Sequence, residues 1–166
     1  MSFSMNPLSI LIEAGLPKID VGVMSHGFAD HGRDYEFVIE DCIGANPGTY
    51  RLTFTHVVAM EYSTALSAPL WNEAWSDDFI DHECWEAAGE PPGYVFGTNW
   101  SNAYPGFAVI SGSAGAAEWS LKLGRPMHAA SLHTDRFKIT LVYHHAVLTK
   151  LSDDAPTVSK VTFPLT

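Results

Sequence analysis

The chain has few basic residues, since nine lysines and arginines stand against nineteen aspartates and glutamates. The net charge is −10 over 166 residues. Nucleic acids and anionic membranes are bound mainly through clustered lysines and arginines, so this balance argues against both as partners. Two interpretations of the acidic surface stay open: it keeps the chain soluble, or it is complementary to a basic protein partner.

Cysteine is scarce as well, and Cys42 and Cys84 do not have the spacing of a metal-binding motif. Two thiols without such a pattern are typical of a protein in a reducing compartment. The sequence shows neither a basic leader segment nor an apolar run long enough to cross a membrane. It therefore predicts a cytoplasmic protein, and no motif in it calls for a cofactor.

Strong alternation marks the stretch Tyr50–Tyr62, whose even positions are mostly apolar and include His56. A period of two predicts a β-strand with one buried face. Thirteen residues exceed a typical strand, so we expect a bulge, a bend or early fraying. The segment Asp34–Ile43 alternates too, and the turn residues Asn46–Gly48 predict that the two segments form a hairpin.

Other segments complete the expected architecture. Strands are predicted at Ile19–Val23, Phe107–Ile110, Met127–His133, Arg136–Leu151 and Thr157–Phe163. Helices are predicted at Asn6–Gly15, at Ser76–Gly89 and from Ser111 or Ser113 to Leu123. The sum is a single α+β domain over residues 1–166, with a largely antiparallel sheet of about six to eight strands and two main helices packed on it.

Aromatic side chains are frequent around the predicted central helix and the loop after it. The candidates are Trp71, Trp75, Trp85, Trp100 and Tyr104. They either line a small-molecule pocket or an interface, or form a second hydrophobic layer between helix and sheet. Two histidines, His56 and His145, share the parity of the apolar residues in their strands, so they either line a cleft or are core histidines with satisfied hydrogen bonds.

Asp78, His82 and Glu86 are spaced four residues apart, which places them on one face of the predicted helix. Imidazole and carboxylate groups in this arrangement are able to bind zinc or manganese. The alternative is a solvated charged face of an ordinary surface helix. These three residues are therefore weak candidates for a metal site.

One stretch carries a resemblance to known proteins. Residues 107–153 combine a short strand, a Ser-capped helix with Ala117-Glu118-Trp119, a Gly-Arg-Pro exit and a strand ending in His144-His145. This order is similar to a pattern in small uncharacterised bacterial proteins, whose last strand often carries a His-Asp pair where this chain has two histidines. Some small acidic α+β bacterial proteins of similar build are immunity proteins, so the resemblance implies that the chain acts by binding.

The sequence thus favours a non-catalytic bacterial binding protein, of immunity type, with an acidic surface for a basic partner. Two alternatives stay open: a metal-dependent hydrolase, and a small-ligand-binding protein with a cleft lined by aromatic and histidine side chains. A homodimer is compatible with all three, because an edge strand such as Thr157–Phe163 is able to pair with a second copy.

Overall fold

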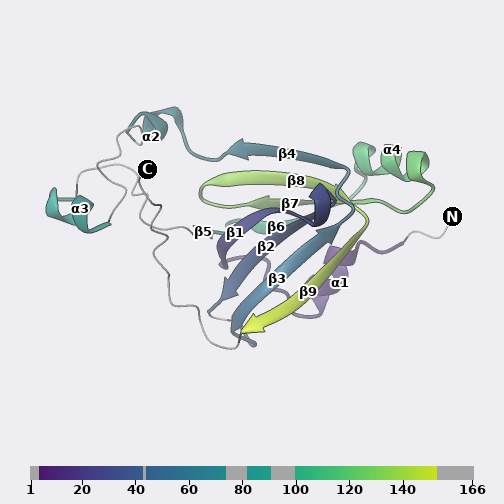
Figure 1. Ribbon diagram of the computed structural model, residues 1–166, viewed down its shortest axis with the longest axis horizontal. Helices are drawn as coiled ribbons and strands as arrows, with labels where there is room; N and C mark the ends of the chain where they lie inside the picture. Colours follow the sequence, from purple (N-terminus) through teal and green to yellow (C-terminus); the bar gives the residue numbers. More distant parts are fainter. Residues whose placement is uncertain (1–3, 43, 74–81, 91–99, 153–166) are drawn as a thin grey trace.

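A computed structural model of the chain describes residues 4–42, 44–73, 82–90 and 100–152. In these residues, nine strands form two antiparallel sheets, in the orders β5-β1-β2-β3-β9 and β4-β8-β7-β6 (Figure 1). The strands are β1 (Gly22–Ala29), β2 (Asp34–Asp41), β3 (Gly48–Thr55), β4 (Ala59–Thr64), β5 (Ser101–Asn102), β6 (Gly106–Ile110), β7 (His128–His133), β8 (Phe137–Tyr143) and β9 (His145–Ser152). The α+β class is confirmed, but the strands exceed the expected six to eight and form two sheets instead of one.

Two of the four α-helices in the described residues, the first and the last, pack on the sheets. The helices are α1 (Pro7–Glu13), α2 (Ala68–Glu73), α3 (His82–Ala87) and α4 (Ala114–Leu123), and a 3₁₀ turn, η1, covers Asp30–Gly32. Leu8 of α1 is fully buried, and α4 covers Ala129 and Val142 on the outer face of the four-stranded sheet. No helix in the described part of the chain is long and apolar enough to cross a membrane.

The predicted helix at Ser76–Gly89 does not pack as expected. Its described part contains α3, which is six residues long. Figure 1 shows α3 well away from both sheets. The second helix on the sheets is therefore α1, because its apolar residues Leu8, Leu11 and Ile12 reach the core. By contrast, α4 is as predicted: the Ser113 side chain caps its start and Gly124 ends it in the left-handed conformation.

One hydrophobic core joins the two sheets. The predicted hairpin is confirmed as β2 and β3, with Phe37 opposite Leu52 and both side chains fully buried. On the other sheet, Ile139 and Leu141 of β8 face inward and are buried as well. Because the inner faces of both sheets are apolar, they shield each other from water, and this burial is the main source of stability.

Two neighbouring strands pass from one sheet to the other at the same corner. The chain bends between β3 and β4 at residues 56–58, and between β8 and β9 at His144. The His144 N–H donates to the Thr55 carbonyl over 3.0 Å, and the Val58 N–H donates to the Val142 carbonyl over 2.9 Å. The long strands predicted at residues 50–62 and 136–151 are thus each divided in two, the first by a bend, which is one of the three irregularities expected from its length.

The Asp34 side chain stabilises this corner through hydrogen bonds. Its carboxylate is buried and accepts two hydrogen bonds from the Arg33 guanidinium, at 2.8 and 2.9 Å. It also accepts the backbone N–H of His56 over 3.0 Å. His56 has a positive φ of 52° and is the residue at which the chain leaves the first sheet. The hydrogen bond from Arg33 is the main cause that lowers the pKa of the Asp34 carboxyl, so the group stays ionised.

Replacing this carboxylate tests whether it stabilises the corner. We expect Asp34→Ala to lower the free energy of unfolding by about 1–3 kcal/mol at pH 7, because the His56 N–H loses its acceptor. Since the pKa is lowered in the folded state, this advantage of the wild type should fade as the pH falls below about 4. Urea unfolding of both proteins from pH 7 to pH 3 measures this difference in the free energy of unfolding. Glu118→Gln, which removes an exposed carboxylate, should leave the midpoint nearly unchanged.

A glycine marks a close approach of backbone segments next to β6. A Cβ atom on Gly106 would lie 1.7 Å from the Lys18 carbonyl oxygen, and the residue has a positive φ of 88°. Gly112 also has a positive φ, 67°, but a Cβ there would meet nothing within 4 Å. We expect Gly106→Ala to cost more than about 3 kcal/mol, and Gly112→Ala only about 1 kcal/mol from backbone strain. Equal losses in thermal unfolding would contradict the close approach.

Candidate functional site

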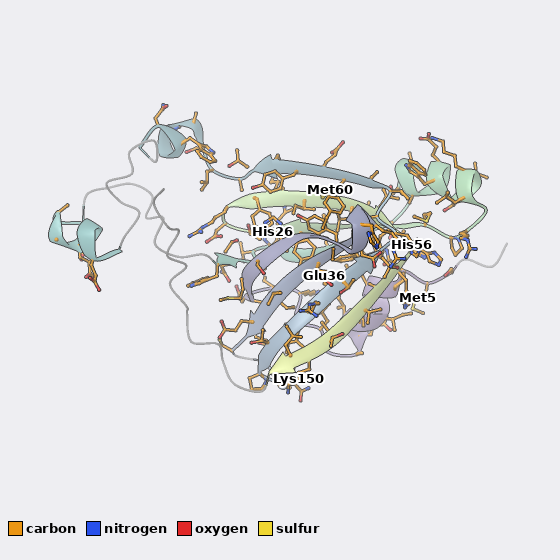
Figure 2. The ribbon with its side chains drawn as sticks, viewed as in Figure 1. Met5, His26, Glu36, His56, Met60 and Lys150 are labelled. Atoms are coloured by element: carbon orange, nitrogen blue, oxygen red, sulfur yellow. The ribbon has the colours of Figure 1, made fainter. Side chains whose placement is uncertain are left out.

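A cluster of aromatic rings surrounds His26 where the two sheets face each other. We call it the His26 cluster, and it contains His26, Tyr35, Phe37, Tyr62 and Phe137. The His26 ring of β1 lies 4.5 Å from the Phe137 ring of β8 and 6.3 Å from the Tyr62 ring of β4, centroid to centroid. One imidazole of the five-stranded sheet thus contacts two rings of the four-stranded sheet. Figure 2 shows the labelled His26 among these strands.

A short hydrogen bond joins the two polar side chains of this cluster. The Nδ1 atom of His26 lies 2.6 Å from the Tyr35 hydroxyl. Burial lowers the pKa of His26 and raises the pKa of Tyr35. Both groups are therefore neutral at pH 7, and the arrangement that fits is a tyrosine hydroxyl donating to the unprotonated Nδ1 atom.

An open cleft of about 250 Å³ adjoins the cluster. Its lining comes from β1, β4, α2, β5, the start of β8 and adjoining residues, and consists of Val23, Met24, Ser25, His26, Tyr62, Leu66, Trp71, Ser101, Arg136 and Phe137. The Trp71 indole N–H donates to the Thr64 hydroxyl over 2.9 Å, which fixes the ring beside the end of β4. We call this feature the aromatic cleft.

Large apolar side chains remain exposed around the aromatic cleft. Tyr62 is 58% exposed, Phe28 is 52% exposed and Trp71 is 43% exposed. They come from β4, β1 and α2, and the Phe28 ring packs edge-on against Tyr35 of the His26 cluster at 4.9 Å. Single exposed apolar residues are ordinary, but two large aromatic side chains exposed in the lining of one hollow, Tyr62 and Trp71, are typical of a binding surface.

A larger hollow of about 1000 Å³ lies beside α4 and is lined mostly by small and apolar residues. Three of its polar side chains already serve the fold. Asn6 accepts from the Leu8 N–H and the Tyr143 hydroxyl, Ser113 caps α4, and Ser120 bonds the backbone of Ala116 and Met127. Because these groups hold α4 and the chain start in place, the aromatic cleft is the better candidate site.

The predicted aromatic candidates that the structure describes belong to different parts of the fold. Trp71 lies in the aromatic cleft. Trp100 is half-buried before β5, Tyr104 is exposed between β5 and β6, and Trp85 belongs to α3. Trp75 falls outside the described residues.

The interpretation of His56 and His145 as core histidines is wrong. Both are exposed, and the His56 ring lies 6.0 Å from His144 instead. The physical reason is the corner: each bend interrupts the alternation, so that Ala146 is buried in place of His145. A period-two pattern carries across a bend only if the strand continues in the same sheet.

The weak metal candidates are only partly described. His82 and Glu86 belong to α3, and Asp78 lies outside the described residues. Within the part of the chain that the structure describes, no three His, Cys, Asp or Glu side chains are grouped so that they could hold a metal ion.

Sequence reasoning missed the residues that form the His26 cluster as a group. His26 lies in β1, which runs from Gly22 to Ala29 and extends well beyond the strand predicted at Ile19–Val23. The register of β1 shifts between Val23 and Ser25, so the inward face changes parity just before His26. An even alternation of Met24, His26 and Phe28 was the available signal, but nothing local assigns that face to the core.

The architecture defines the class of this protein: a small α+β protein of two antiparallel sheets with a shared core and an aromatic cleft on one side. The family model described as "YxiG-like protein" matches residues 11–160. This match covers most of the chain, which therefore belongs to the YxiG-like protein family.

Two further comparisons add little. A crystal structure of an uncharacterized protein from Neisseria gonorrhoeae is similar at a TM-score of 0.36 and 10% sequence identity, over 80% of this chain and 93% of that one. At this level the similarity carries no argument. No curated protein matches the chain.

The lowered pKa of His26 predicts acid sensitivity. The unfolded state binds a proton near pH 6.5 and the folded state only at lower pH, so stability should fall as the pH drops below about 6.5. His26→Gln should flatten this part of the profile, leaving a remainder from His128, whose pKa burial also lowers. Urea unfolding at pH 8, 7, 6 and 5 measures the slopes. A slope for His26→Gln identical to that of the wild type would refute the assignment.

Proposed function

We propose that this protein is a non-catalytic binding protein that docks a partner protein on the aromatic cleft. The observation that carries the proposal is the exposure of Tyr62 and Trp71 in the lining of one hollow. Aromatic side chains in this position bury much area at little entropic cost when a partner covers them. They cost solubility while they stay uncovered, which gives a reason to expect a partner.

The size of the cleft favours a partner protein over a small ligand. Ligand pockets usually measure about 300–1000 Å³ and enclose most of the ligand. The aromatic cleft measures about 250 Å³ and is open. It suits one apolar side chain of a partner, with the rings of Tyr62 and Trp71 packing against it, as at the centre of a protein interface.

The charge of the chain supports a basic partner. A net charge of −10 creates a negative potential that speeds association with a positive surface and opposes acidic partners. An immunity protein, which neutralises a toxin by binding it, is the form of this function that the resemblance of residues 107–153 implies. The free, exposed thiol of Cys42 fits the reducing cytoplasm as the place of action.

The chemistry beside His26 fits binding better than catalysis. A catalytic histidine needs a nucleophile or a reacting group within hydrogen-bond distance. The group at 2.6 Å from His26 is the Tyr35 hydroxyl, whose pKa is raised, which is the opposite of an activated nucleophile. The hydrolase hypothesis therefore gains nothing from this site.

Loss of the exposed rings should abolish partner capture. The immobilised protein is incubated at low salt with cytoplasmic extract of the cells that make it. We expect wild type to retain a basic protein that the double variant Tyr62→Ala/Trp71→Ala binds at least tenfold less, since truncation of a central aromatic residue costs about 2 kcal/mol. Quantitative mass spectrometry of the eluates measures the difference.

Leu121→Ala is the matched control. Leu121 is a large apolar side chain on α4, 85% exposed and outside the aromatic cleft. It should capture the same partner as wild type, and rising salt should weaken both. Equal capture by all three proteins, or no specific capture by wild type, would refute the proposed function.

A further inference from the structure

We infer that the partner binds as an added β-strand along the free edge of β4, through an extended segment in which apolar residues alternate with basic ones. This inference rests on the proposed function, because it names the partner segment for the same aromatic cleft. Three features of β4 carry it: its unpaired edge, the face that its side chains share with the core, and its charge.

The outer edge of β4 is unpaired in the described part of the chain. β4 is the end strand of its sheet, and all six of its residues are exposed. Beyond its end, the Ala65 N–H donates to the Arg136 carbonyl over 2.8 Å. Thr64 and Phe137 therefore form a non-hydrogen-bonded pair, and the backbone groups of Thr64, Tyr62 and Met60 point to the free edge.

β4 lacks most of the features that protect an edge strand, although it carries one charge, Glu61. Folded proteins usually block an edge strand with lysine, proline or a bulge. β4 contains neither lysine nor proline, and its register with β8 has no shift from Ala59 to Thr64. An edge of this kind is a template for another strand, and main-chain pairing is a common way to bind an extended segment.

A strand added to β4 would extend the inner face of the sheet beside the aromatic cleft. Met60 is opposite Leu141 and Tyr62 is opposite Ile139, and both partners in β8 are buried in the core. Met60 and Tyr62 thus lie on the core side yet stay exposed. Figure 2 shows Met60 and His26 in the region between β4 and β1. Every second side chain of an added strand would continue this face, so we expect apolar residues there.

The outer face of β4 favours basic residues at the remaining alternate positions of the added strand. Glu61 is opposite Thr140 and is the charged residue of β4. A basic residue opposite Glu61 in the added strand would form a favourable cross-strand pair. A second copy of this chain would bring another Glu61 and another net charge of −10, so charge favours the basic strand over self-association.

A displayed peptide library tests the strand directly. Nine-residue peptides alternate apolar positions with Lys, Arg or Thr, and a control library has the same composition at helical spacing. Both are selected against the full-length protein. We expect enrichment from the alternating library only. Methylation of alternate backbone nitrogens in a selected peptide should weaken binding at least tenfold, because main-chain hydrogen bonds are lost while side chains and charge are kept.

Protein variants locate the contact. Glu61→Lys should weaken a selected peptide at least fivefold, and Glu118→Lys, which reverses an exposed acid on α4, should leave its affinity unchanged. Circular dichroism checks that both variants fold. Equal enrichment of the two libraries, or binding that N-methylation leaves intact, would overturn strand addition. So would a wild-type dimer in light scattering that Glu61→Lys dissociates, because the occupant would then be a second copy.

The two proposals fail in different ways. One outcome is that peptides bind the double variant Tyr62→Ala/Trp71→Ala more weakly than wild type, while N-methylated peptides bind wild type as tightly as unmethylated ones. This outcome would overturn the added strand and leave the aromatic cleft as the binding site. Peptides that bind this double variant as tightly as wild type would overturn the added strand at the cleft. The capture experiment with cell extract then decides the proposed function independently.

Discussion

The buried carboxylate of Asp34 is the interaction on which the arrangement of the sheets depends. It accepts the His56 N–H at the residue where the chain leaves the five-stranded sheet, and Arg33 keeps it ionised. The neighbouring pair of strands crosses at the same place, through the bond from His144 to Thr55. Because two strands turn together, the ladder of hydrogen bonds continues from one sheet to the other, and the inner faces are brought together around one core.

This corner explains why one side of the molecule is open. The helix α1 contacts β9 of one sheet, while its capping residue Asn6 bonds Ala129 and Tyr143 of the other, so that side is closed. The side formed by β1 and β4 has no such cover in the described residues. On that side, ring contacts of His26 with Tyr62 and Phe137 join the two sheets. A protein that binds through this side uses the uncovered part of its own core face.

Local patterns predicted the elements whose neighbours in sequence are also their neighbours in space. The β2–β3 hairpin has a turn signal at Asn46–Gly48, and α4 has Ser113 and Gly124 at its ends, so both followed from the sequence. The position of His145 did not, because alternation says nothing of where a strand bends. The aromatic cleft was beyond prediction for the same reason: its residues come from β1, β4, α2, β5 and β8, and only long-range pairing brings them together.

By itself, the sequence determined the α+β class, the antiparallel pairing and the acidic charge, since each follows from composition or from a short repeating pattern. The tertiary structure decided that the strands form two sheets, that His56 and His145 are exposed, and that His26 meets Tyr35 and Phe137. The physical reason is that a bend and a register shift each change which face of a strand is buried. Both arise from contacts between residues far apart in the chain.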